Sequence, residues 1–220
     1  MAAHAPGRVT RSRRAELLRG IYVIINEEPR ALELAGAVLD AGVRLVQYRA
    51  KNGILGDRVR SLRVLTRTHD ALLLMNDDWR AAVEYDCDGV HLGPGDNGFE
   101  RVAPVREALE ERLIGLSCGT IEEVRAANAS GVDYLGIGSV FPTSSKADAG
   151  APIGIEGLRQ LARASAVPVA AIGGITATSI PEVRRAGAAM AAVISAIAGA
   201  PQPRRATEEL LGDWTRSEAR

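Results

Sequence analysis

An amide and two cations alternate along one short apolar stretch of the sequence, where that stretch ends. Gln47, Arg49 and Lys51 are two residues apart, and the two-residue period of an extended strand puts them on one face. A cation that points into a protein interior needs an anionic partner, because burying an unpaired charge is costly. Guanidinium and ammonium groups bind phosphate oxygens well. The spacing therefore indicates a binding site for phosphate or a similar anion.

Carboxylates follow the next two apolar stretches. Asn76, Asp77 and Asp78 end the first of them, and Asp96 comes shortly after the second. One or two carboxylates beside phosphate-binding cations are a common way to hold Mg²⁺, which takes its other ligands from water and from substrate phosphates. Asp77 or Asp78 is equally suited to cap the helix that begins near Trp79. The sequence leaves both roles open for this pair.

Hydroxyl and glycine residues follow the later stretches. Ser117 either donates to a phosphate or caps the next helix together with Thr120. A hydroxyl-rich turn that ends in a lysine and two turns after the last strands complete the set: Thr143, Ser145 and Lys146, then Gly173 and Gly174, then Ile194 and Ser195. Loops after the seventh and eighth strands of an α/β barrel commonly form a phosphate site.

Two further features have less specific interpretations. The segment from Phe141 to Gly154 lacks periodicity, and a loop of this length in a compact domain is more often a functional lid than a connector. His91 has no carboxylate or serine partner visible in the sequence. We therefore interpret it as a packed or loop-bridging histidine.

These side chains need a scaffold that brings strand ends together. Short apolar runs bounded by turn residues alternate with helical stretches, which is the pattern of repeated βα units around a parallel sheet. We predict strands at Ile21–Asn26, Val43–Arg49, Ala71–Asn76, Gly89–Leu92, Leu113–Ser117, Tyr134–Val140, Val167–Ile172 and Ala189–Ser195. Helices are expected, among others, at Arg30–Asp40, Asp57–His69, Ile121–Ala129, Ile155–Ala164, Ser179–Ala186 and Thr207–Thr215.

Eight such units predict an α/β protein that is a single (β/α)8 TIM barrel. Reactive groups of such barrels lie at the C-terminal ends of the strands, where the polar residues of this chain occur. An open, doubly wound sheet is the alternative, but the GxGxxG turn after the first strand is missing. We expect residues 1–19 to be a basic extension with the start of a first barrel helix, over Arg14–Arg19, and residues 20–220 to be the catalytic barrel.

Composition narrows the choice of partners and compartment. Lysine plus arginine and aspartate plus glutamate both number 27 in this 220-residue chain, so no overall field draws it to nucleic acid or to an acidic membrane. Cys87 and Cys118 are too few for a disulfide framework and suit buried positions in a reducing cytosol. The apolar run Ile21–Ile25 is too short for a signal peptide or a membrane span. We expect a cytoplasmic protein, with an organelle-targeting leader at the basic N-terminus as the alternative.

Five motifs occur in a fixed order along the chain: Gln47-x-Arg49-x-Lys51, Asn76-Asp77, Gly89-Val90-His91-Leu92-Gly93, Phe141-Pro142-Thr143-x-Ser145-Lys146 and Ala171-Ile172-Gly173-Gly174-Ile175. Each motif alone is weak, but their joint order is specific. On these motifs the chain resembles the thiamine-phosphate synthase family over roughly residues 20 to 200. The resemblance implies a transferase that joins 4-amino-2-methyl-5-hydroxymethylpyrimidine diphosphate to 4-methyl-5-(2-phosphoethyl)thiazole, or to its carboxylate. Pyrophosphate is released and thiamine phosphate is formed.

The same resemblance implies roles for individual residues. The diphosphate would be held by Arg49, Lys51, Asn76 and Lys146, and Mg²⁺ by Asp77 and Asp96. The pyrimidine would be oriented by Gln47 and Ser117, and the thiazole phosphate would be held by Thr143, Ser145, Gly174, Ile194 and Ser195. Arg49, Lys51, Lys146 and Ser117 would act in catalysis. In the family's reaction the thiazole nitrogen that attacks carries no proton, so no general base is needed.

Some positions depart from the family pattern. Ser145 stands where threonine is common, and Pro94-Gly95 replaces a more polar pair before Asp96. Asp78, with the Trp-Arg pair after it, differs from the usual residues that follow Asn-Asp, so the second metal-side carboxylate could be Asp78.

Two competing functions follow from the same fold. A related thiazole tautomerase uses a histidine two residues after the serine of the fifth strand, a position that Gly119 occupies here. A non-catalytic barrel that binds phosphorylated ligands is the other alternative, because fold does not fix function. Small phosphorylated substrates are the expected partners in each case, and the sequence leaves the oligomeric state open.

Overall fold

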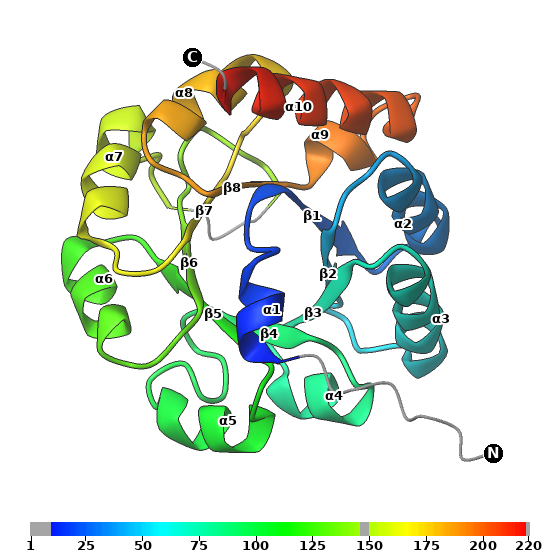
Figure 1. Ribbon diagram of the computed structural model, residues 1–220, viewed down its shortest axis with the longest axis horizontal. Helices are drawn as coiled ribbons and strands as arrows, with labels where there is room; N and C mark the ends of the chain where they lie inside the picture. The colour runs from blue at the N-terminus through cyan, green and yellow to red at the C-terminus, as the bar shows by residue number, and fades with distance from the viewer. Residues whose placement is uncertain (1–9, 146–149, 219–220) are drawn as a thin grey trace.

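Eight parallel strands form a closed barrel in the computed structural model, which describes residues 10–145 and 150–218. Each strand pairs with the next, and β8 pairs with β1 to close the ring (Figure 1). The strands are β1 (Gly20–Asn26), β2 (Leu45–Arg49), β3 (Leu72–Asn76), β4 (Gly89–Leu92), β5 (Leu113–Cys118), β6 (Tyr134–Ile137), β7 (Val169–Ile172) and β8 (Met190–Val193). The prediction of a (β/α)8 TIM barrel is confirmed.

Helices surround the strands on the outside of the ring (Figure 1). They are α2 (Ala31–Asp40), α3 (Gly56–Thr68), α4 (Trp79–Glu84), α5 (Val102–Leu109), α6 (Ile121–Asn128), α7 (Gly154–Ala164), α8 (Ile180–Arg185), α9 (Ser195–Ala198) and α10 (Pro203–Glu218), with a short 3₁₀ turn η1 (Ala177–Ser179) before α8. The predicted helices are confirmed in place. The last of them begins earlier than predicted, at Pro203, since proline suits the first turn of a helix.

Five predicted strands are too long, and two of them, the third and the seventh, begin later than predicted, at Leu72 and at Val169. The second begins at Leu45 because the N–H of Val43 bonds back to the carbonyl of Val38 in α2. The sixth ends at Ile137, and the eighth ends before Ser195, which is instead the first residue of α9. Apolar runs continue past the parallel ladder at these ends, so composition alone overestimates strand length.

Side chains of the strands alternate between two hydrophobic layers. Those that point outward, such as Val23 and Val46, pack against the surrounding helices. Those that point inward fill the barrel, and include Tyr22, Ile24, Leu45, Leu72, Leu74, Leu113, Tyr134, Ala170, Met190 and Ala192. Every strand is therefore buried on both faces. The two-residue period of a strand decides which of its side chains point into the barrel and which point toward the helices.

Helix α1 (Arg11–Ala15) lies across the centre of the ring and closes the N-terminal end of the barrel (Figure 1). The prediction of a first barrel helix over Arg14–Arg19 is therefore wrong. The helix ends at Ala15, and Leu18 is buried among the interior residues of the barrel. Arg14, expected on an outer helix, instead pairs with Asp88 at the N-terminal strand ends, and Arg11 before it pairs with Asp133.

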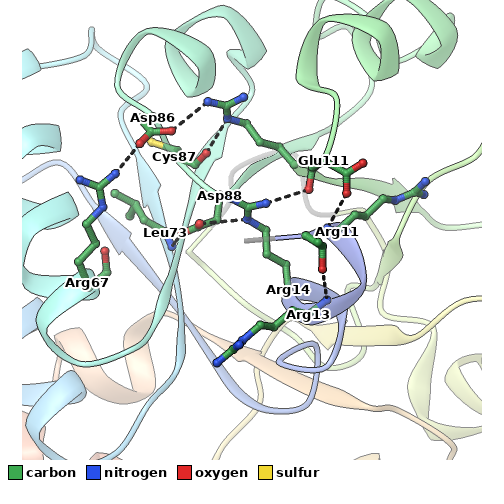
Figure 2. A network of polar contacts seen from close by, with 12 residues as sticks. Arg11, Arg13, Arg14, Arg67, Leu73, Asp86, Cys87, Asp88 and Glu111 are labelled. Atoms are coloured by element: carbon green, nitrogen blue, oxygen red, sulfur yellow. Dashed lines mark hydrogen bonds and ion pairs between the residues drawn. The ribbon is translucent and has the colours of Figure 1, made fainter. Parts of the chain in front are cut away.

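Asp88, directly before β4, is the centre of this polar end (Figure 2). Its carboxylate accepts hydrogen bonds from the N–H of Leu73 at 3.0 Å, from Arg14 Nε at 3.2 Å and from Arg63 Nη1 at 2.6 Å. The side chains of Asp88 and Arg14 are only 6% and 9% exposed. Asp133, directly before β6, repeats the arrangement with the N–H of Ile114 and two arginines.

Cys87 and Cys118 are both buried and free, as expected for structural thiols in this chain. In the part of the chain that the structure describes, every helix is too short or too polar to cross a membrane.

Asp88→Ala is expected to lower the free energy of unfolding by about 3–5 kcal/mol, because it leaves Arg14 and Arg63 without their buried counter-charge. Urea denaturation followed by circular dichroism measures the loss. Asp57→Ala is the matched control, because Asp57 is fully exposed where it pairs with Arg60 and should barely move the midpoint. Equal losses for the two variants would contradict a stabilising role of the buried pairs.

Candidate active site

A pocket with a volume of about 330 Å³ opens at the C-terminal end of the barrel. Every predicted site residue that the structure describes lines it: Gln47, Arg49, Lys51, Asn76, Asp77, Asp96, Ser117, Thr143, Ser145, Gly174, Ile194 and Ser195. Lys146 lies outside the described residues. The strand ends of a parallel barrel meet at one face, and this juxtaposition is what places residues from distant parts of the chain in one cavity.

Strand β2 supplies the first group of polar residues. Gln47 points into the barrel, is 2% exposed, and donates through Nε2 to the hydroxyl of Tyr22 at 2.6 Å. Arg49 lies two residues further on the same face, and its Nη1 donates to Asn26 Oδ1 at the end of β1, at 3.0 Å. Lys51 follows just beyond the strand and also lines the pocket. The structure confirms the prediction that Gln47, Arg49 and Lys51 share one face, which lines the pocket.

Asp77 and Asp78 occupy different environments. The side chain of Asp77 lines the pocket and pairs with Lys51 Nζ at 2.5 Å. Its backbone is left-handed, with φ of 66°, and its N–H bonds to the carbonyl of His91 at 2.9 Å. Asp78 is exposed and caps α4, accepting from the N–H groups of Arg80 and Ala81 at 2.9 and 3.0 Å. The structure therefore assigns the helix cap to Asp78 and leaves the carboxylate of Asp77 at the pocket.

Asp96 is half-buried opposite Asp77. Burial raises the pKa of Asp96 to about 6; the N–H of Gly93, donating at 2.6 Å, lowers the pKa, and the neighbouring carboxylate of Asp77 raises it again. Because the carboxylate of Asp77 disfavours the ionised form of Asp96, the pair gains from a cation placed between them. Among the described residues, His, Cys, Asp and Glu side chains form no cluster of three or more suited to a metal. A carboxylate pair without softer ligands suits Mg²⁺, which needs few protein ligands.

Ser117 lies on the same floor of the pocket as His91. His91 Nε2 is 3.0 Å from Ser117 Oγ, and His91 Nδ1 is 3.0 Å from the hydroxyl of Tyr134. The prediction that His91 lacks a serine partner is wrong. His91 pairs with Gly115 across β4 and β5, so Ser117, two residues further, shares its face. The signal was present in the sequence, but it depends on the register between two strands.

Ser117 does not cap α6 together with Thr120. Thr120 caps that helix by itself, accepting from the N–H of Glu123, and the Glu123 carboxylate accepts from the N–H of Thr120 and of Gly119 in return. The Thr-x-x-Glu spacing is the known capping-box signature. This frees the hydroxyl of Ser117 for the pocket.

Backbone groups form the opposite wall. Gly173 and Gly174 follow β7 with φ of 99° and 64°, in the left-handed region that favours glycine. A Cβ atom at Gly174 would lie 2.5 Å from the carbonyl oxygen of Pro142, so the loops after β6 and β7 pack directly together. Thr143 lies in the first of these loops, where its hydroxyl accepts from the N–H of Ser145 at 3.2 Å.

Several residues of the pocket were not among the predicted site residues. Tyr22, His91, Glu123 and Ser139 also line it. Tyr22 has the sequence pattern of a core residue, and Glu123 that of a helix cap, so neither type points to a site. Together the lining offers cations and carboxylates on one side, glycine N–H groups on the other, and an amide and hydroxyl floor. Such a cavity can hold a flat polar ring between two anionic groups.

Comparisons with known proteins agree with this geometry. A family model described as thiamine monophosphate synthase matches residues 21–197. The chain is 45% identical over 185 residues to the thiamine-phosphate synthase of Archaeoglobus fulgidus, covering 81% of this chain and 84% of that protein. It is 42% identical over 200 residues to the enzyme of the same name from Geobacillus kaustophilus, covering 86% and 89%.

A solved structure gives the same result. Thiamine phosphate pyrophosphorylase from Pyrococcus furiosus superimposes with a TM-score of 0.82 at 37% sequence identity, covering 92% of this chain and 98% of that one.

Asp78→Ala is expected to lower the free energy of unfolding by about 1 kcal/mol, because it removes the cap of α4. Asp77→Asn should cost less or even stabilise the protein, since it relieves the repulsion with Asp96 and asparagine tolerates a positive φ. Urea denaturation without divalent cations compares the two variants. A larger loss for Asp77→Asn than for Asp78→Ala would contradict this division of roles.

Proposed function

The chain belongs to the thiamine monophosphate synthase family of transferases, and from this premise we propose its substrates and mechanism. The enzyme joins 4-amino-2-methyl-5-hydroxymethylpyrimidine diphosphate to 4-methyl-5-(2-phosphoethyl)thiazole or its carboxylate, and releases pyrophosphate. When the carboxylate is the substrate, its carboxyl group leaves as carbon dioxide. The observation that carries the proposal is the gathering of all described candidate residues around one pocket. Its charge pattern matches two phosphorylated substrates that meet end to end.

The diphosphate binds on the side of β2, β3 and β4. Arg49, Lys51 and Asn76 contact its oxygens, and Lys146, which lies outside the described residues, completes the set by family likeness. Asp77 and Asp96 would hold Mg²⁺, which when bound neutralises charge on the diphosphate. Lys51 and Asp77 pair with each other. A bound diphosphate can replace Asp77 as the partner of Lys51, and Mg²⁺ can replace Lys51 as the partner of Asp77, so the observed pair supports this arrangement.

The thiazole phosphate binds on the opposite side. The N–H groups of the turn at Gly173 and Gly174 and the hydroxyls of Thr143, Ser145 and Ser195 are suitable donors for a phosphate monoester. The pyrimidine ring lies between the two phosphate sites, on the floor that Gln47 and Ser117 form. Holding both substrates in line lowers the entropy cost of the reaction.

The chemistry needs charge neutralisation more than proton transfer. The bond from the methylene carbon to the diphosphate oxygen breaks, and the ring system stabilises the resulting cation. The thiazole nitrogen then donates its lone pair to that carbon. Arg49, Lys51 and Lys146 stabilise the negative charge on the departing pyrophosphate. The nitrogen carries no proton, so no residue has to act as a base.

Two observations favour this reaction over that of a thiazole tautomerase. Gly119 occupies the place of the tautomerase histidine, and its N–H is engaged by the Glu123 carboxylate. A tautomerase also has no diphosphate to neutralise, so Arg49, Lys51 and the two carboxylates would lack a purpose in it. A binding protein without turnover would retain affinity for both ligands but form no product.

The purified protein, mixed with both substrates and Mg²⁺, is expected to form thiamine phosphate and pyrophosphate in equal amounts. Chelation of Mg²⁺ should abolish most of the rate. Liquid chromatography of the products measures both quantities. The absence of thiamine phosphate under every condition would refute the proposal, and isomerisation of the thiazole carboxylate alone would indicate the tautomerase.

Asp77→Asn is expected to raise the Mg²⁺ concentration for half-maximal rate at least about tenfold, or ~1.4 kcal/mol, because the site loses an anionic ligand. Asp78→Asn is the matched control, since asparagine is as good a helix cap as aspartate. Initial rates over a Mg²⁺ series compare the variants. Equal or reversed effects would move the metal ligand to Asp78.

A further inference from the structure

A chain of hydrogen bonds crosses the barrel beneath the pocket and joins the two residues proposed to contact the pyrimidine. Gln47 Nε2 is 2.6 Å from the hydroxyl of Tyr22, which is 3.0 Å from the hydroxyl of Tyr134. That hydroxyl is 3.0 Å from His91 Nδ1, and His91 Nε2 is 3.0 Å from Ser117 Oγ. Five side chains from β1, β2, β4, β5 and β6 thus form one continuous polar path.

The middle of the chain is closed to water. Gln47 and Tyr22 are each 2% exposed, and Tyr134 is fully buried. A buried hydroxyl whose proton has no acceptor costs about 1–3 kcal/mol. Each member of the chain must therefore satisfy its neighbours, which makes the proton positions depend on one another.

Tight packing fixes the rings that carry these groups. The ring of Tyr134 meets that of Tyr22 edge-on at 6.0 Å and lies 5.4 Å from the imidazole of His91. A Cβ atom at Gly115 would lie 2.1 Å from the ring of Tyr134, and one at Gly136 would lie 2.8 Å from His91 Cε1. The two strand glycines leave space for these rings and hold them in place.

The protons follow in order from Gln47. Because its amide N–H donates to Tyr22, the hydroxyl proton of Tyr22 must point to Tyr134, and that of Tyr134 must point to His91 Nδ1. A neutral imidazole that accepts at Nδ1 carries its proton on Nε2. Nε2–H then donates to Ser117 Oγ, and the proton of Ser117 is left for the pocket.

We propose that Tyr22, Tyr134 and His91 are positioning residues that make Gln47 a hydrogen-bond acceptor and Ser117 a donor toward the pocket. This pair of groups fits an aromatic heterocycle with an amino group beside an unprotonated ring nitrogen. An oxo ring, with its carbonyl beside a ring N–H, presents the reverse pattern. To bind it in the same way, every hydrogen bond from Gln47 to Ser117 would have to reverse its direction. The choice of ring rests on the proposed function, whereas the proton order does not.

The proton order is tested without any substrate. Imidazole ¹⁵N chemical shifts of the full-length protein carrying His4→Gln and His69→Gln report His91 alone, at a pH of about 8.5 where an ordinary imidazole is neutral. We expect the Nε2–H tautomer, and in the Tyr134→Phe variant a mixture of tautomers. A predominant Nδ1–H tautomer in the parent, or no change in the Tyr134→Phe variant, would overturn the proposal.

The consequence for specificity is tested by kcat/KM for the amino and oxo forms of the pyrimidine diphosphate. Tyr134→Phe is expected to reduce the preference for the amino form about tenfold, because Ser117 and Gln47 can then turn independently. The KM for the thiazole phosphate should stay unchanged, which a general structural defect would not allow. Intrinsic reactivity of the two rings cancels when the variant is compared with the parent.

Two more variants complete the design. Tyr22→Phe cuts the chain at another bond and should reduce the preference similarly, which keeps the test valid if Tyr134→Phe does not fold. Tyr48→Phe is the control, because it removes a hydroxyl that bonds to Glu27 and takes no part in the chain of hydrogen bonds. This variant should preserve the preference for the amino form. An unchanged preference in the chain variants would overturn the proposal. Lack of turnover in the parent would instead reject the proposed function and leave the tautomer result standing.

Discussion

The hydroxyls of Tyr22 and Tyr134 lie 3.0 Å apart inside the barrel, at the boundary between its apolar interior and the polar pocket. Toward the N-terminal end, the interior holds apolar side chains such as Leu72 and Leu113. Toward the C-terminal end lies the polar pocket. Burying a polar group at this boundary is costly unless another polar group forms a hydrogen bond with it. The amide, hydroxyls and imidazole therefore form one connected chain rather than isolated sites, and the chain ends where the pocket begins.

Carboxylates at the two ends of the barrel are used in opposite ways. At the N-terminal end, Asp88 accepts from a backbone N–H and from two arginines, and Asp133 has the same kind of partners. Their charge is compensated within the fold, which anchors α1 and closes the barrel. At the C-terminal end, Asp77 and Asp96 face each other, and Lys51 pairs with only one of them. This pair retains unbalanced negative charge at the face where the pocket opens.

Much of this arrangement could be predicted from the sequence, because a parallel barrel imposes a simple rule. Apolar runs indicate the strands, the period of two gives the inward face, and the end of each run gives a position at the pocket. Gln47, Arg49 and Asn76 follow that rule directly. The short α1 did not, because its arginines are explained by tertiary partners at Asp88 and Asp133 rather than by a helical pattern. Strand ends were also overestimated where apolar residues continue beyond the ladder.

The link between His91 and Ser117 shows where such reasoning stops. Periodicity assigns a residue to a face, but the register between neighbouring strands decides which residue it meets, and a shift of one residue would turn each side chain away. Tyr22 and Tyr134 have the pattern of core aromatic residues, and their hydroxyls acquire a role only because they approach each other across the barrel. Gly115 and Gly136 look unremarkable in sequence, yet they provide the space that this approach requires. The candidate site residues can be found one by one along the chain, whereas the residues proposed to orient them come together only in the folded barrel.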